Sequence, residues 1–358
     1  MLQAMRNLAS IRPKVHWGRP SSQPWNHGLS HVAISIASMS LGFLAVVPPA
    51  HARRTEGRCH LSHPTILTFS PDETVTALAI SPAGSLLAAG TNRGRLVVWS
   101  LPSGIKRLET IGSRRIEDLA FSPDGRLLAA ASVRPGLRIW HMDETPRELV
   151  LSEPAQGVMA LAFAADGSLL AFGGRDRTVG FYRLHDSKPP MKLSLRLAGH
   201  SSWVSALAFS SDGKRLYSGS WDDRIRAFDM ASGHLAWESH VHKFPIDALL
   251  ATPAGLAASS DDGRLTFHRY RDGRVTRQYK PGAVVAMSLQ GNLLAGLTWE
   301  GKLLFMDSTK ARIRCAPRIA KRRHRGTWSL ALSRTIVAVG DNRGRVLVYH
   351  LPRILLGH

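Results

Sequence analysis

The sequence predicts an all-β protein, a seven-bladed β-propeller made of four-stranded antiparallel blades. A strand pattern recurs seven times at a spacing of about 40 residues, and no segment shows helical periodicity over a full helix length. Strands such as Leu86–Ala89 and Val346–Tyr349 are apolar on both faces. A sheet that is covered on both sides needs such strands, and a blade packed between two neighbours is covered in this way.

Each repeat contains three strands separated by turns of fixed character. A short apolar strand leads to a turn with Pro, Asp or Gly, then to a second apolar strand that ends in small residues. A polar turn and a third strand with an aromatic residue near its end complete the unit. The seven repeats are Val75–Ser100, Ile116–His141, Val158–Arg183, Val204–Asp229, Ile246–Tyr270, Val284–Asp307 and Thr327–His350.

A fourth strand is expected at the outer edge of each blade. Segments between repeats, for example Ile105–Thr110 and Leu193–Leu197, are suited to this position. The seventh repeat has little chain after it, whereas Thr65–Phe69 before the first repeat has no other partner. We therefore expect this N-terminal strand to close the ring, which would remove exposed strand edges. The tail, residues 352–358, could compete for the same place.

The N-terminal segment differs from the rest of the chain. Met1–Thr55 contains no Asp or Glu, and basic residues precede the apolar run Val32–Val47. Two prolines end this run, and Ala50-His51-Ala52 follows. A basic region, an apolar region and an A-x-A site in this order predict a signal peptide that is removed after Ala52.

The predicted organisation is a leader over 1–52, a linker over 53–64, the propeller over 65–351 and a tail over 352–358. Removal of the leader would give an exported protein, periplasmic or secreted. An organelle-targeting peptide and a membrane anchor formed by residues 32–47 are the alternatives. The apolar run is short for a membrane span, which needs about 20 residues.

Charge and cysteine content limit the partners and the compartment. The net charge of +21 favours acidic proteins or anionic polymers as partners, although charge alone does not identify one. Cys59 and Cys315 are the only cysteines, so no C-x-x-C metal or haem motif exists. In an exported protein the two could form a disulfide, and otherwise they would remain thiols.

The repeat period and the turn Ser122-Pro123-Asp124-Gly125 resemble the WD-repeat family over about Thr65–Leu351. The dipeptide that gives the family its name reads Trp99-Ser100, Trp140-His141, Tyr182-Arg183, Phe228-Asp229, Arg269-Tyr270, Met306-Asp307 and Tyr349-His350. The resemblance implies a structural His–Ser/Thr–Asp–Trp tetrad within a blade. Only the fourth repeat comes near it, with His200, Ser218 and Asp222, and with Phe228 in place of Trp. The other blades must hold their turns by different means.

The resemblance also implies a binding face. In the family, the turns between second and third strands and the loops that precede first strands lie on one side. Arg and Trp gather in these segments here, and such a face would suit phosphate, sulfate or carboxylate groups. The candidate binding residues are Arg93, Arg134, Arg175, Arg177, Trp221, Arg224, Arg264, Trp299, Lys321, Arg322, Arg323, Arg325 and Arg343. Alternatively, these are simply exposed polar turns, and Trp203 and Trp328 pack between blades.

No catalytic, metal or cofactor site is predicted. The sequence has no H-E-x-x-H, G-x-S-x-G or P-loop motif, and Asp222-Asp223 and Asp261-Asp262 lack a calcium ligand series. The predicted function is a non-catalytic scaffold, a monomeric module within a complex, that binds protein partners, acidic ones among them, through a basic face bearing Trp. The alternatives are binding of nucleic acid, lipid or polysaccharide, and an enzyme or ligand carrier that uses the central channel.

Overall fold

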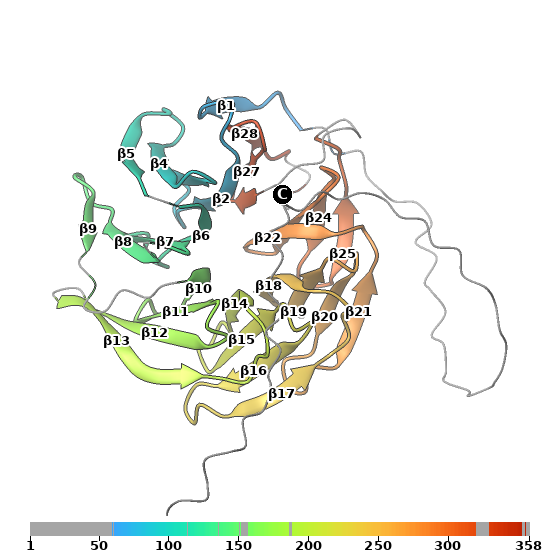
Figure 1. Cartoon of the computed structure of the whole chain (residues 1–358). Coiled ribbons are helices and arrows are strands. Elements are labelled where there is room, and N and C mark those ends of the chain that lie inside the picture. The colour runs from blue at the N-terminus through green and yellow to red at the C-terminus, as the bar shows by residue number, and fades with distance from the viewer. Residues whose placement is uncertain are drawn as a thin grey trace, which may run out of the picture. The chain divides into compact units, whose positions relative to one another are not determined.

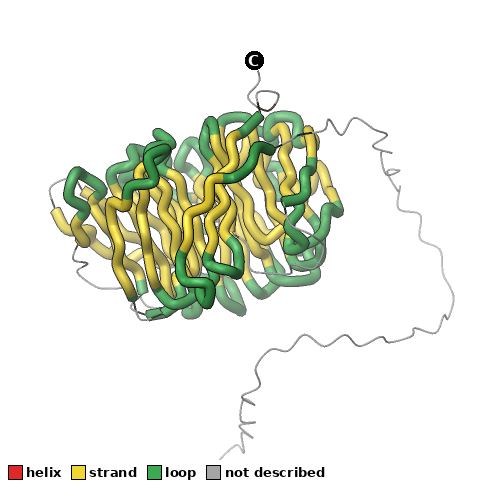
Figure 2. Tube along the Cα trace, turned by 90° about the horizontal axis from the view of Figure 1, so that it is seen from above, coloured by secondary structure: helices red, strands yellow, loops and turns green. Residues whose placement is uncertain are grey.

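The computed structural model describes residues 59, 61–112, 114–134, 136–149, 151, 157–185, 188–319, 329–352 and 355. Its strands form seven four-stranded antiparallel sheets around a central axis (Figure 1). This arrangement confirms the predicted seven-bladed propeller. In the side view the strands run between two rims of loops (Figure 2). The predicted leader and most of the linker lie outside the described residues, and within those residues no helix has the length and apolarity to cross a membrane.

Each of the first six blades is a meander that starts beside the axis and ends at the outer edge (Figure 1). Blade 1 consists of β2 (Val75–Ile80), β3 (Leu86–Thr91), β4 (Arg95–Ser100) and β5 (Lys106–Ile111). Blade 2 consists of β6 (Ile116–Phe121), β7 (Leu127–Ser132), β8 (Leu137–His141) and β9 (Arg147–Leu149). Blade 3 consists of β10 (Val158–Phe163), β11 (Leu169–Gly174), β12 (Val179–His185) and β13 (Lys188–Leu197).

The second half of the ring repeats this order. Blade 4 consists of β14 (Val204–Phe209), β15 (Arg215–Ser220), β16 (Ile225–Asp229) and β17 (Leu235–Ser239). Blade 5 consists of β18 (Ile246–Thr252), β19 (Gly255–Ser260), β20 (Leu265–His268) and β21 (Val275–Tyr279). Blade 6 consists of β22 (Val284–Gln290), β23 (Leu293–Thr298), β24 (Leu303–Asp307) and β25 (Arg312–Cys315). Blade 7 consists of β26 (Ser329–Leu332), β27 (Ile336–Gly340) and β28 (Arg345–His350), with β1 (Thr65–Thr68) outermost.

Small and large apolar residues alternate along the inner strands and cover opposite faces of a blade. In blade 1, Ala77 and Ala88 pack against blade 2, whereas Leu87 and Trp99 pack against blade 7. Successive residues of a strand point to opposite faces. Along the first strand β2, Ala77 and Ala79 therefore face blade 2 whereas Leu78 faces blade 7, so small side chains on one face allow the next blade to approach closely.

The first strands of neighbouring blades are joined at their starts. In each of the first six blades, the pairing register between the first and second strands shifts at the second residue. The hydroxyl of Thr76, at such a shift, donates to the carbonyl oxygen of Ile116 at 2.6 Å, and that of Ser205 donates to the carbonyl oxygen of Ile246 at 2.6 Å. The starts of the first strands therefore lie at the same rim of the ring.

The N-terminal strand closes the ring. β1 pairs antiparallel with β28, with Thr65 opposite Val348 and Thr68 opposite Arg345. This pairing confirms the expected closing strand, and β1 extends one residue less than the predicted segment. The C-terminal tail does not take this place. Its Leu355 is buried instead in the apolar cluster that joins blades 6 and 7.

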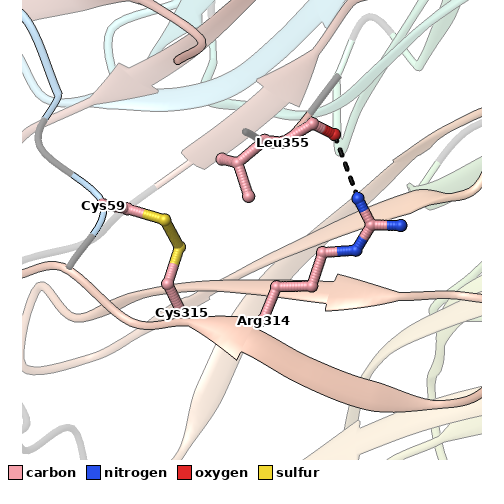
Figure 3. Close-up of a disulfide and its surroundings, with 4 residues drawn as sticks. All are labelled: Cys59, Arg314, Cys315 and Leu355. Atoms are coloured by element: carbon pink, nitrogen blue, oxygen red, sulfur yellow. Dashed lines mark hydrogen bonds between the residues drawn. A yellow bond between two sulfur atoms is a disulfide. The ribbon is translucent and has the colours of Figure 1, made fainter. Parts of the chain in front are cut away.

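A disulfide secures the segment that precedes the closing strand. Cys59 bonds to Cys315 at the end of β25, with their Cα atoms 6.0 Å apart (Figure 3). Beside this bond, Arg314 donates from Nη1 to the carbonyl oxygen of Leu355 at 3.1 Å (Figure 3). The disulfide therefore ties the N-terminal segment to blade 6, one blade away from the blade that β1 completes.

The third strand of the fifth repeat ends earlier than the sequence suggested. β20 ends at His268, which lies opposite Leu256. Trp99 lies opposite Leu87 and Phe228 opposite Leu216 in the same way. His268, not Arg269, therefore takes the place of the family's Trp in blade 5. The aromatic residue that guided the alignment, Tyr270, lies in the turn that follows the strand.

Candidate interaction face

One rim of the ring carries both kinds of segment that the sequence singled out. In an antiparallel meander, the turn between second and third strands lies at the same end as the loop that leads to the next blade. We call this rim the loop face. It comprises described residues 69–74, 92–94, 112, 114–115, 133–134, 136, 151, 157, 175–178, 198–203, 221–224, 240–245, 261–264, 280–283, 299–302, 316–319 and 341–344.

Most of the predicted loop-face arginines have partners within the chain. Arg93 forms an ion pair with Asp72 at 2.5 Å, and Arg224 forms one with Glu238. Arg264 donates to the carbonyl oxygen of Val241 at 3.2 Å. Arg134 and Arg343 also interact with other residues. Lys321, Arg322, Arg323, Arg325 and Trp328 lie outside the described residues.

Arg175 and Arg177 are different. Both are exposed in the turn between β11 and β12, and neither has an ion-pair partner within the part of the chain that the structure describes. The guanidinium carbon of Arg175 lies 4.5 Å from the ring centroid of Trp203, a cation–π contact. Asp176, between the two arginines, is held by Arg196 at 3.0 Å and by the hydroxyl of Thr178.

Three large apolar side chains are exposed on the loop face. Trp221 is 45% exposed, Phe244 55% and Trp299 40%. The rings of Trp203 and Trp221 contact each other with centroids 4.6 Å apart, so Arg175, Trp203 and Trp221 form one stack across blades 3 and 4. We call these three residues the Arg–Trp stack. Sequence reasoning missed Phe244, although its position in the loop before a first strand was a usable signal.

Buried polar networks fix the loop-face turns of blade 4. His200 donates from Nδ1 to Asp222 at 3.0 Å, and its Nε2 accepts from the hydroxyl of Ser218 at 2.7 Å. Arg226 adds an ion pair to Asp222 at 3.0 Å. Burial alone would raise the pKa of Asp222, but hydrogen bonds from His200, the Ser201 amide and Arg226 hold that pKa well below its usual range.

Blade 5 contains a related network that the sequence analysis did not identify. His242 contacts Asp262 at 3.1 Å and the hydroxyl of Thr266 at 2.9 Å, and Thr266 contacts His268 at 2.8 Å. Nδ1 of His268 donates to the carbonyl oxygen of Gly273 at 2.9 Å. The available signal was spacing, because His242 and His200 each lie four residues before their first strands.

Burial controls protonation in the blade 5 network. It lowers the pKa of His268 to about 4, although the bond to Gly273 favours the charged form. Burial also lowers the pKa of His242, and the charge of Asp262 opposes this shift. A buried imidazole in apolar surroundings is therefore kept neutral at pH 7, as a structural hydrogen-bonding group.

Arginines hold the corresponding turns of blades 1 and 7. In blade 1, Arg95 donates from Nε to the buried carboxylate of Glu73 at 3.1 Å. In blade 7, Arg345 donates from Nε to Asp341 at 2.8 Å, and its amide also bonds to this buried carboxylate. Blades 1 and 7 therefore hold their loop-face turns with ion pairs in place of the tetrad.

The first strands surround a central cavity of about 570 Å³ with two unusual carboxyl groups in its lining. Burial raises the pKa of Asp118 to about 7, although the amides of Leu119 and Leu161 donate to it. Burial, together with the charges of Asp261 and Asp262, raises the pKa of Asp247 to about 8. These two carboxyls come from blades 2 and 5, and no His, Cys, Asp or Glu cluster of metal-binding size occurs among the described residues.

The fold defines the class of protein, a seven-bladed β-propeller built from repeats. The chain matches the family profile "WD domain, G-beta repeat" at residues 63–100, 106–141, 147–183 and 191–229, which extend from β1, the closing strand, to β16, the third strand of blade 4. Together with the relatives described next, these matches support the WD-repeat family for this chain, without indicating a particular subfamily.

The chain is similar to curated proteins over part of its length. It is 33% identical to human WD repeat-containing protein 55 over 120 residues, 33% of this chain and 30% of the relative. It is 35% identical to an uncharacterized WD repeat-containing protein of Synechocystis over 117 residues, 32% of each chain. It is 37% identical to small ribosomal subunit protein RACK1 of Glycine max over 78 residues, 21% of this chain and 24% of the relative. The matches thus cover about a third or less of these relatives.

Proposed function

We propose that this WD-repeat propeller is a non-catalytic scaffold that binds a protein partner through its loop face. The exposed Trp221, Phe244 and Trp299, on the same rim as arginines that have no ion-pair partner among the described residues, are the observation that carries the proposal. Aromatic and arginine side chains dominate the energetics of protein interfaces, because they bury large areas and make directional bonds. The buried networks beneath them hold the turns in place, which lowers the entropic cost of binding.

The face combines charge and apolar surface unevenly. Within the described part of the chain, arginines without an ion-pair partner lie on the side of blades 2 and 3, where Arg114 joins Arg175 and Arg177. The exposed aromatic residues lie on the side of blades 4–6. Ion pairs within the chain reduce the positive charge elsewhere on the rim, so a protein surface with mixed character fits it better than a uniformly charged polymer.

The proposal is tested by capture of binding partners from extracts of the native compartment with the full chain. We expect a triple variant, Trp221→Ala, Phe244→Ala and Trp299→Ala, to lose the partner that the wild type retains. The matched control carries Ile105→Ala and Leu235→Ala, exposed apolar residues located near the opposite rim. Equal capture by the triple variant and the wild type would contradict a role of the loop face.

We also propose that the protein is exported and that its leader is removed after Ala52. The Cys59–Cys315 disulfide supports this proposal, because disulfides persist in oxidising compartments and are rare in the cytosol. N-terminal sequencing of the natural protein should give Arg53 as the first residue. A protein that starts at Met1, or that reacts with a thiol reagent at both cysteines before reduction, would contradict the proposal.

A further inference from the structure

We infer that the Arg–Trp stack is a subsite for a peptide segment that carries a carboxylate next to an apolar side chain. The inference rests on the proposed function of the loop face and names the part of the partner that this position recognises. Arg175 would bind the carboxylate of an Asp or Glu, and Trp221 would be covered by the apolar side chain.

The stack leaves the hydrogen-bonding edge of Arg175 available. The guanidinium carbon of Arg175 lies 4.5 Å from the ring centroid of Trp203, and a guanidinium has five N–H donors, more than one ring contact can occupy. No hydrogen bond or ion pair of the Arg175 side chain occurs among the described residues, so its donors are available to bind a carboxylate in a bidentate manner. Packing against Trp203 also restricts the side chain before binding, which reduces the entropy lost on association.

The charges near the stack leave the two arginines uncompensated. Asp176, the nearest carboxylate in sequence, is engaged by Arg196 at 3.0 Å and by the hydroxyl of Thr178 at 2.9 Å. Arg175 and Arg177 therefore supply two positive charges at one turn without an acidic partner among the described residues. A single carboxylate from a partner would complete this arrangement.

The same surroundings favour a peptide over a polyanion. Beyond Trp221 the turn continues with Asp222, which is buried and ion-paired to Arg226, and with Asp223, which is partly exposed. A nucleic acid or acidic polysaccharide running across the stack would place further negative charges against the carboxylate of Asp223. A peptide can instead place its negative charge at Arg175 and an uncharged apolar side chain on Trp221, which is 45% exposed.

The test uses an array of short Gly–Ser peptides, each with one Asp and one Phe or Leu at varied spacing, and the full chain as the binding protein. We expect binding only where both residues are present. Replacement of Asp by Asn should weaken the affinity by about ten-fold or more. Arg175→Gln and Trp221→Ala should each weaken the selected peptide to a similar extent. The affinity of Arg175→Lys for this peptide should lie between those of the wild type and Arg175→Gln, because lysine keeps the charge but lacks the guanidinium that contacts Trp203.

The matched control is Arg274→Gln, an exposed arginine in a turn of the opposite rim, which should bind like the wild type. Selected peptides that are insensitive to Arg175→Gln and Trp221→Ala but lost with Phe244→Ala would overturn the subsite while leaving the loop-face function intact. An array without Asp-dependent binding would overturn it as well. Heparin is the polyanion probe. Heparin binding that displaces the peptide, is lost in Arg175→Gln and is kept in Arg274→Gln would assign the site to polyanions instead.

Discussion

Blades 4 and 5 are neighbours with the same strands and the same buried His–Asp contact, yet they manage charge in opposite ways. Blade 4 pairs its charges, with Arg226 bonded both to Asp222 at 3.0 Å and to Glu238 at 2.7 Å. Blade 5 has Thr266 at the place of Arg226, and His268 at the place of Phe228. Its network therefore relies on neutral groups that burial keeps uncharged.

The difference shows that one structural task can be met by ion pairs or by neutral hydrogen bonds, with different responses to pH. The first strands repeat the contrast. Ser205 of blade 4 donates its hydroxyl to the next blade, whereas the equivalent Asp247 of blade 5 has a carboxyl oxygen, Oδ2, without a hydrogen-bond partner in the described part of the chain. We therefore expect removal of a charged group to destabilise blade 4, and the appearance of a charge on a buried group to destabilise blade 5.

The largest effect is expected for Asp222→Ala in blade 4. The change leaves the guanidinium of Arg226 and the imidazole of His200 buried without their shared partner, and unpaired buried charges are costly. We expect the free energy of unfolding to fall by about 3 kcal/mol, measured by urea denaturation at pH 7. Asp262→Ala in blade 5 should cost about half as much, because the arginine beside it, Arg264, is 27% exposed, whereas Arg226 is only 9% exposed and loses more when it is left unpaired. Equal losses would remove the distinction between the two blades.

A second prediction concerns Asp247→Ser, which gives blade 5 the residue that blade 4 has. Asp247 has a pKa of about 8 in the folded protein, above its ordinary value of 3.8. Its contribution to stability is therefore complete at low pH and is lost as the pH rises toward 8. The advantage of the Ser variant over the wild type should grow by about 2.5 kcal/mol from pH 5 to pH 7.

Denaturation midpoints at both pH values measure this advantage, and Asp118 acts as a common background because both proteins contain it. Since burial raises the pKa of Asp118 to about 7, the wild type and the variant share its titration. A pH-independent difference between the two proteins would mean that Asp247 is not kept protonated by the fold.

His268→Phe should show the opposite pH dependence. The folded pKa of His268, about 4, lies below its ordinary value of 6.5, so its contribution to stability is complete above pH 6.5 and is lost as the pH falls toward 4. Relative to the variant, the wild type should lose about 2 kcal/mol between pH 7 and pH 5. The same two-point denaturation experiment measures this loss, and a constant difference would contradict it.

The smallest effect is expected for the exposed pair of blade 4. Arg224→Gln breaks the contact with Glu238, but the arginine side chain is 39% exposed and Glu238 keeps Arg226 as a partner. The free energy of unfolding should change by no more than about 0.5 kcal/mol, as is typical of surface ion pairs. A loss comparable to that of Asp222→Ala would show that the outer pair supports the network as well.

The fold could be predicted because every blade has the same kind of neighbours, so each repeat shows the same order of apolar strands and polar turns. Thr65–Phe69 could be assigned by elimination, since no other strand was available to complete the last blade. The disulfide could not be decided, because two cysteines 256 residues apart in sequence carry no information about distance in space. Blade 5 was misaligned because Tyr270 supplied the expected aromatic residue two positions after His268.

The candidate face was harder to derive from sequence. Arginines in turns can be counted, but their partners lie on strands whose pairing the sequence does not specify, as Glu238 does for Arg224. The contact between Arg175 and Trp203 depends on the packing of two successive blades. The sequence therefore identified the residue types on the rim, whereas the subset with unused charge became visible only in three dimensions.

The closing strand has a consequence for the order of folding. β1 is among the first strands to be synthesised and β28 is the last, yet the two are hydrogen-bonded neighbours. Blade 7 cannot be completed until nearly the whole chain is available, and a contact between such distant residues is entropically costly to form early. Until then β28 would expose an unpaired edge, which is an aggregation hazard. The rate at which β1 reaches that edge should therefore set the time during which the nascent propeller needs protection.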